Sequence, residues 1–167
     1  MRKITLALLI LLSVSTLVAG CGVKQKIQQK IGESIVEKVV EDALSDENAK
    51  VDIDGGKITI EGKDGESFSF GAGKWPDVDY IPEFKKGKII STSKDEKDSI
   101  AVIFEEVAKK DIEDYVKNIK KDFTEETYEV NSDDSIVFNG KNSEGARVHI
   151  QYFINDKSLT IIGSRSE

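Results

Sequence analysis

The stretch Val51-Asp-Ile-Asp-Gly-Gly-Lys-Ile-Thr-Ile60 alternates apolar and polar residues on either side of a glycine pair. A period of two is typical of strands with one buried and one solvated face, and Gly55-Gly56 is a typical hairpin turn. A second turn signal, Asp64-Gly65, precedes Phe68 and Phe70. The sequence therefore predicts a three-stranded β-meander over residues 49–73, whose solvent side carries Asp52, Asp54, Lys57, Thr59 and Glu61.

The segment that follows, residues 74–84, contains the only tryptophan and both prolines of the chain. Prolines restrict the backbone and large apolar side chains favour burial, so this segment is expected to dock and not to act as a loose linker. Two roles are open for it. It packs on the following residues as a structural strap, or it offers Trp75, Tyr80 and Phe84 as an interaction surface.

The remainder of the chain predicts one α+β domain over residues 74–167. A strand begins at Ile89, and Ser99 to Val107 returns with apolar residues on both faces, as a central strand does. Asp111 is expected to cap a helix whose apolar residues follow helical spacing, namely Ile112, Tyr115, Val116, Ile119 and Phe123. Four strands then follow, at 128–130, 135–139, 146–153 and 158–162. The predicted fold class is α+β, an antiparallel sheet with one helix packed on a face.

An amphipathic helix is predicted ahead of the meander. Apolar side chains recur every three or four residues between 23 and 44, at Val23, Ile27, Ile31, Ile35, Val36, Val39, Val40, Ala43 and Leu44. Lysines come first and acids later, an order that opposes the helix macrodipole but suits lysines close to anionic head groups. Residues 21–48 are therefore predicted to be a tether whose apolar stripe packs on the domain, the membrane or another copy.

The first twenty residues predict a cleaved signal peptide. Arg2 and Lys3 precede an apolar run of about 15 residues, shorter than the roughly 20 that a transmembrane helix needs. Val18-Ala19-Gly20-Cys21 follows and is similar to a bacterial lipobox. Cleavage between Gly20 and Cys21 would make Cys21 the lipid attachment site, as a diacylglyceryl cysteine. Two acyl chains suffice for stable anchoring, so we expect an extracytoplasmic protein on the outer face of the cell membrane.

The net charge of the chain limits the classes of partner that it is expected to bind. The formal net charge is −7, and removal of Arg2 and Lys3 with the signal peptide makes the mature protein more acidic. An acidic surface is repelled by nucleic acid, so nucleic acid is not an expected partner. Cys21 is the only cysteine, which excludes an intramolecular disulfide.

Taken together, the lipobox, the tether, the Asp-Gly hairpins, Lys74-Trp75-Pro76 and Ile81-Pro82-Glu83-Phe84 form a familiar combination. The chain resembles a family of small uncharacterised lipoproteins from low-GC Gram-positive bacteria. The resemblance covers most of the mature chain and implies a membrane-anchored protein. It implies no activity, because that family has none assigned.

The residues that could carry chemistry are sparse. His149 is the only histidine, and its alternation with Val148 and Ile150 places it with Arg147 and Gln151 on the opposite face of its strand. No base or nucleophile accompanies it in the sequence, so no catalytic residue is assigned. Asp52-x-Asp54-Gly55 with Glu61 is an incomplete calcium loop, so neither a metal nor another cofactor is predicted.

Three functions compete on this basis. The favoured one is a non-catalytic module that binds a protein or envelope component at the cell surface, which predicts an exposed apolar or aromatic patch. The alternative is an envelope hydrolase or its accessory, which predicts a deep cleft with two carboxylates of raised pKa. A small-molecule receptor ranks last because so short a chain leaves little room for two lobes.

Overall fold

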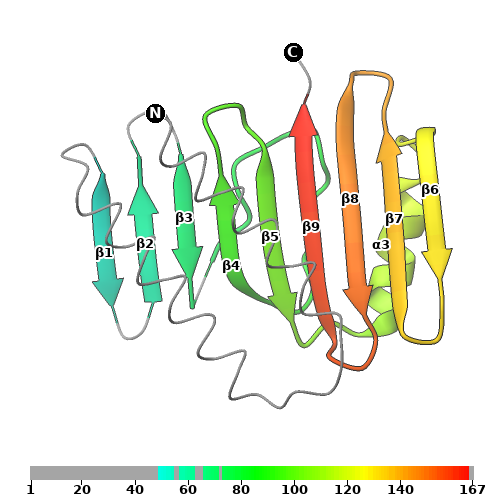
Figure 1. The fold of residues 1–167 in the computed structure, drawn as a ribbon, viewed down its shortest axis with the longest axis horizontal. Coiled ribbons are helices and arrows are strands. Elements are labelled where there is room, and N and C mark those ends of the chain that lie inside the picture. Colours follow the sequence, from blue (N-terminus) through cyan, green and yellow to red (C-terminus); the bar gives the residue numbers. More distant parts are fainter. Residues whose placement is uncertain (1–48, 55–56, 63–65, 72, 166–167) are drawn as a thin grey trace.

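The computed structural model describes residues 49–165, except 55–56, 63–65 and 72 (Figure 1). The signal peptide, the lipobox and the amphipathic segment 23–44 lie outside the described residues. Among those described, no helix is long and apolar enough to cross a bilayer.

Nine strands and one helix make up this part of the chain. The meander consists of β1 (Lys50–Asp54), β2 (Lys57–Glu61) and β3 (Ser67–Phe70). The central hairpin is β4 (Lys88–Lys94) and β5 (Ile100–Glu105), followed by α3 (Lys109–Ile119). The last four strands are β6 (Glu125–Asn131), β7 (Ser135–Lys141), β8 (Ala146–Phe153) and β9 (Ser158–Arg165).

All nine strands join one antiparallel sheet in the order β1-β2-β3-β4-β5-β9-β8-β7-β6 (Figure 1). The predicted α+β class is wrong, because the described chain is a broad sheet with a single 11-residue helix. The strands themselves were predicted near their observed positions. What the prediction missed is that β3 pairs with β4 across the strap, from Ser67–Lys94 to Phe70–Ser91, which fuses the meander with the later strands. Backbone pairing between segments so far apart leaves no mark in local sequence periodicity.

The core lies on the face of the sheet that α3 and the strap cover, which we call the helix face. It is built from alternate residues of β5, β7, β8 and β9, among them Val102, Phe138 and Ile150, all fully buried. From α3 the core receives Ile112, Tyr115, Val116 and Ile119, as the helical spacing predicted. Asp111 lies in the first turn of α3 and is not its cap, because the helix begins after Ala108 without a side-chain cap.

The strap of residues 74–84 crosses the helix face as a packed layer. The Tyr115 hydroxyl of α3 donates to the Pro82 carbonyl at 2.7 Å, and the Tyr80 hydroxyl donates to the Asp98 carbonyl. Ile81 approaches β9 so closely that a Cβ on Gly163 would lie 2.1 Å from its Cδ1. A Cβ at this position would have to displace the end of the Ile81 side chain, so glycine lets the strap pack closely on the sheet.

The opposite side, which we call the far face, is turned toward the viewer in Figure 1, with α3 behind β7. Strand register aligns its side chains in rows, since directly paired residues share a face. One row crosses all nine strands through Val51, Ile60, Phe68, Ser93, Ala101, Ile162, His149, Asn139 and Tyr128. The neighbouring row includes Ile58, Phe70, Ser91, Ile103, Thr160, Gln151, Val137 and Val130. The far face is thus apolar toward β1 and more polar toward β6.

Candidate functional site

The strap does not present the aromatic surface that was one of its two predicted roles. Tyr80 and Phe84 are buried in the core, where the Phe84 ring meets Phe104 edge-on at 5.2 Å. Arg165 stacks over the Tyr80 ring at 5.3 Å, and burial raises the pKa of the Tyr80 phenol. Both rings therefore serve packing in this structure.

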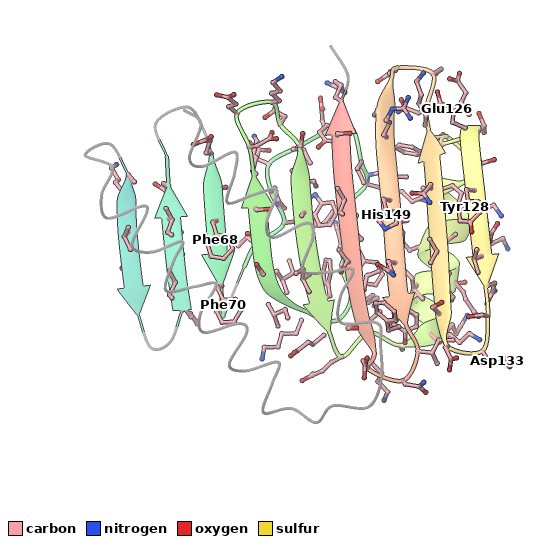
Figure 2. All side chains as sticks on the ribbon, in the orientation of Figure 1. Phe68, Phe70, Glu126, Tyr128, Asp133 and His149 are labelled. Atoms are coloured by element: carbon pink, nitrogen blue, oxygen red, sulfur yellow. The ribbon has the colours of Figure 1, made fainter. Side chains whose placement is uncertain are left out.

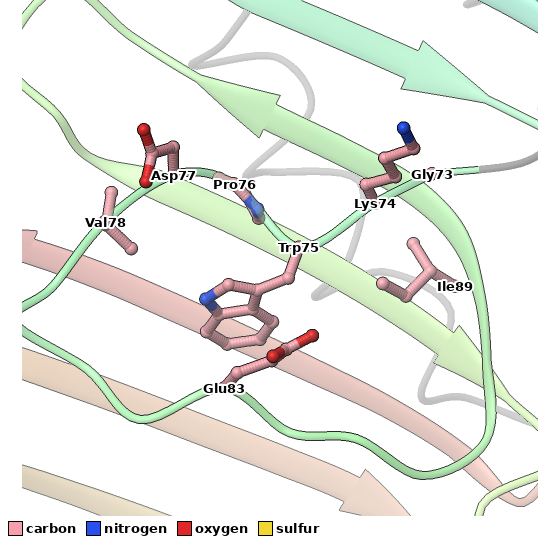
Figure 3. A pocket seen from close by; sticks show the side chains of 8 residues that line it. All are labelled: Gly73, Lys74, Trp75, Pro76, Asp77, Val78, Glu83 and Ile89. Carbon is pink, nitrogen blue, oxygen red and sulfur yellow. The ribbon is translucent and has the colours of Figure 1, made fainter.

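Trp75 is only half-buried, unlike Tyr80 and Phe84, and it lines a hollow (Figure 3). The hollow measures about 600 Å³ and is lined by Gly73, Lys74, Trp75, Pro76, Asp77, Val78, Glu83 and Ile89. The indole packs against Phe104 with ring centroids 6.4 Å apart, and its Nε1 is buried with no hydrogen-bond partner in the described part of the chain. The charged side chains at the hollow, from Lys74, Asp77 and Glu83, are exposed to solvent.

This hollow lacks the features of the cleft that a hydrolase would need. Its two carboxylates stand in solvent, and Glu83 lies 3.7 Å from the Lys85 ammonium. A general acid of the glycosidase type has to be shielded from water to hold its proton at neutral pH. The hollow offers Asp77 and Glu83 no such shielding.

The far face of β6, β7 and β8 carries the other group of polar side chains (Figure 2). We call it the Tyr128 face and define it by Glu126, Tyr128, Asn139, Arg147 and His149. Tyr128 is 58% exposed, the one large hydrophobic side chain so exposed among the described residues. Its row neighbours across β7 and β8 are Asn139 and His149.

An ionic cluster borders Tyr128. Glu126 sits in an irregularity of β6 with φ of 49°, where the register shifts between Glu125 and Tyr128. Arg147 donates from both terminal nitrogens to the Glu126 carboxylate, at 2.6 and 3.2 Å. That fork lowers the pKa of Glu126 and raises that of Arg147, so both groups stay ionised. Lys141 adds a weaker contact to Glu126 at 3.4 Å.

His149 lies where the alternation predicted, on the face opposite Val148 and Ile150. Its Nδ1 is 2.6 Å from the Asn139 amide oxygen, which can only accept, so Nδ1–H is the donor and Nε2 is unprotonated when the ring is neutral. Burial lowers the pKa of His149, which favours this neutral form. The Asn139 amide oxygen orients the ring but cannot act as a base, and among the described residues His149 makes no hydrogen bond to a hydroxyl group.

The described residues hold no group of three or more histidine, cysteine or acidic side chains placed to bind a metal ion. Asp52 and Glu61, from the incomplete calcium loop, are exposed and pair across the β1–β2 ladder with Thr59 and Lys50. Cys21 lies outside the described residues, as does Gly20.

No protein-family model, curated protein or solved structure matches the chain. The resemblance to small lipoproteins of low-GC Gram-positive bacteria therefore stays a prediction from the sequence. Little in the amino-acid sequence indicates the Tyr128 face. Its one local signal is a tyrosine placed among glutamates in Glu125-Glu126-Thr127-Tyr128-Glu129, an aromatic residue where a solvated edge strand needs none.

Proposed function

We propose that this chain is a lipid-anchored, extracytoplasmic protein that binds a protein or envelope component without catalysis, and that the Tyr128 face makes the contact. The main support for this proposal is that the Tyr128 side chain is exposed on the same face as the hydrogen-bonded Glu126–Arg147 ion pair. Tyrosine and arginine are enriched in interface cores, since each combines a large contact area with hydrogen-bonding groups.

The construction of the surface supports this proposal. Tyr128, Asn139 and His149 project from three paired strands, so the sheet fixes their spacing before any partner arrives. The Arg147 fork and the His149–Asn139 contact restrain the polar side chains as well. A preorganised surface loses less conformational entropy on binding than a flexible loop does.

The edge of β6 is less suited to recognition than its face. Glu125, Glu126 and Glu129 place charges along this end strand, and the register shift near Glu126 interrupts regular pairing. Charged side chains and bulges are the usual means by which edge strands resist pairing with another strand. A partner is therefore expected to lie over the Tyr128 side chain and not to extend the sheet.

The proposed lipid anchoring depends on the lipobox and on Cys21. It is tested by mass spectrometry of the amino-terminal peptide from the membrane fraction, for wild type and Cys21→Ser. A diacylglyceryl peptide that begins at Cys21 and is lost in the variant supports lipid anchoring. An uncleaved or unmodified amino terminus overturns it.

The binding surface is tested in intact cells with a photo-crosslinking amino acid placed at position 128. The matched control places it at Glu129, which neighbours Tyr128 in β6 but pairs with the core residue Phe138 and so faces the other way. We expect a defined crosslinked species from position 128 that is absent from position 129 and is reduced at least several-fold by Arg147→Glu. Equal crosslinking at both positions, or no effect of Arg147→Glu, would overturn the Tyr128 face as the contact surface.

A further inference from the structure

The apolar half of the far face lacks a covering layer among the described elements. Here the meander directs its apolar side chains away from the core face, through Val51, Ile58, Ile60, Phe68 and Phe70. On the helix face the same strands carry polar residues, including Asp52, Thr59 and Glu61. None of the apolar meander residues belongs to the core cluster or to the residues packed against it.

Burial on this half is nevertheless deep. Ile60 is 8% exposed, and on β4 Ser91 and Ser93 are 5% and 2% exposed. Both serines lie on the far face, since they pair with Phe70 and Phe68 of β3. The Ser93 hydroxyl has no hydrogen-bond partner among the described residues. Helix α3 and the strap lie on the other side of the sheet and do not account for this burial.

A meander of this kind also needs a cover to be stable. Short hairpins are marginal in water, and three strands become stable when their apolar face packs against something. Strands β1, β2 and β3 contain 5, 5 and 4 residues, and their one apolar side is the far face. We call the apolar half of the far face the meander patch. It consists of Val51, Ile58, Ile60, Phe68, Phe70, Ser91, Ser93, Ala101 and Ile103.

We propose that the apolar side chains of residues 23–44 of the same chain pack on the meander patch. The segment supplies an apolar residue every three or four positions, most of them isoleucine or valine, which match the branched and aromatic side chains of the patch. The patch also contains small residues on β4 and β5, namely Ser91, Ser93 and Ala101, whose side chains are shorter than those of Phe68 and Ile103.

Chain connectivity favours this occupant. Residues 45–49 separate the segment from Lys50, the first residue of β1, and five residues reach at most about 17 Å. A helix of 22 residues would be about 33 Å long, and the six strands from β1 to β9 span about 24 Å across the sheet. The segment is therefore delivered beside the meander patch and is long enough to cover it.

Two other occupants are a second copy and the bilayer. A covalently linked segment competes at a local concentration in the millimolar range, far above that of a second chain in solution. The bilayer would receive the stripe of the segment but would leave the meander patch uncovered. The inference concerns the half of the far face that the Tyr128 face does not use, so it stands or falls separately from the proposed function.

The test pairs a cysteine in the patch with single cysteines in the segment, in the full chain carrying Cys21→Ser so that no other thiol is present. Ser93→Cys is combined with Ile35→Cys or Val39→Cys from the apolar stripe. Matched controls combine Ser93→Cys with Glu37→Cys or Glu41→Cys. These glutamates follow Ile35 and Val39 by two residues and lie on the polar side of the predicted helix. Disulfides form only when the two Cα atoms approach within about 7 Å.

We expect a disulfide within one chain for at least one stripe variant and none for the controls under the same mild oxidation. Disulfides between two chains, increasing with protein concentration, would overturn the proposal in favour of a second copy. No disulfide above the controls would also overturn it. If Ser93→Cys does not fold, Ala101→Cys replaces it, since Ala101 is the neighbour of Ser93 in the same row.

Hydrogen exchange provides a second measurement without new thiols. Amides of residues 23–44 should be protected in the wild type, and Ile60→Asp should remove that protection. Thr59→Asp is the matched control, because Thr59 lies on the helix face and pairs with Ser69 and Asp52. Equal protection in the wild type and Ile60→Asp, or equal loss in both variants, would contradict packing on the patch.

Discussion

The two ends of the sheet bury apolar side chains on opposite faces. Strands β5, β9, β8 and β7 direct Val102, Leu159, Ile150 and Phe138 toward α3 and the strap. Strands β1, β2 and β3 direct Val51, Ile60 and Phe68 to the far side. A single hydrogen-bonded sheet thus carries two apolar surfaces that never share a face.

This difference shows what strand periodicity does and does not specify. Alternation identifies the residues that share a face, because neighbouring side chains in a strand point to opposite sides. It does not say which of the two faces will be covered. The covered face of the later strands is determined by the strap and α3, because both dock on the same side of the sheet.

The largest expected contrast comes from removing one aromatic ring at each end. Phe104 is 1% exposed and contacts Phe84 and Trp75, so Phe104→Ala should lower the free energy of unfolding by about 3–5 kcal/mol. Phe68 is only half-buried, and Phe68→Ala should cost about 1–2 kcal/mol. Urea unfolding of both variants measures the difference. A larger loss for Phe68→Ala would mean that the meander patch, and not the helix face, is the principal core.

A smaller effect is expected where the strap meets β9. Gly163→Ala places a methyl group against Ile81 and Tyr80 and should cost about 1–3 kcal/mol through overpacking. Ser164→Ala is the matched control on the next residue, which faces the other side, and should stay within about 0.5 kcal/mol. Thermal and urea unfolding check both values. Equal stability of the two variants would show that the strap is free to move away from the sheet.

A third prediction concerns a hydrogen bond on the helix face of the sheet, between β3 and β4. Ser69 and Thr92 join their hydroxyls at 2.7 Å in a buried pair, the contact by which β3 adds to this side of the sheet. Ser69→Ala should cost about 1 kcal/mol because the Thr92 hydroxyl loses its partner. Ser67→Ala, on the same face and less buried, should change stability by less than about 0.5 kcal/mol. A neutral Ser69→Ala, measured by urea unfolding, would mean that water replaces the lost bond.

The smallest effect concerns pH and the polar end of the far face. Burial lowers the pKa of His149 in the folded protein below its value of about 6.5 in the unfolded chain. Its contribution to stability is therefore complete above about pH 6.5 and is lost as pH falls toward the folded pKa. His149→Gln should show a flatter stability profile than the wild type between pH 7 and pH 5. Parallel profiles would show that His149 is as hydrated when folded as when unfolded.

Local sequence signals located most of the elements. The positions of β4, β5, β7, β8 and β9 and the apolar face of α3 follow directly from periodicity and turn residues. The side of His149 was also predictable, because alternation within β8 requires no knowledge of the rest of the fold. The Tyr128 face was not, since it needs β6, β7 and β8 to be neighbours in a fixed register.

The sequence by itself determined the strand alternation, the helix, the docking character of the strap and the predicted lipid attachment at Cys21. Each of these depends on residues close together in the chain. Only the tertiary structure decided that the meander continues the main sheet, that Tyr80 and Phe84 are buried, and that apolar surfaces lie on opposite faces at its two ends. These features depend on backbone pairing and packing between distant segments, such as Ser69 with Thr92 or Ile81 with Gly163, and local composition carries no record of such contacts.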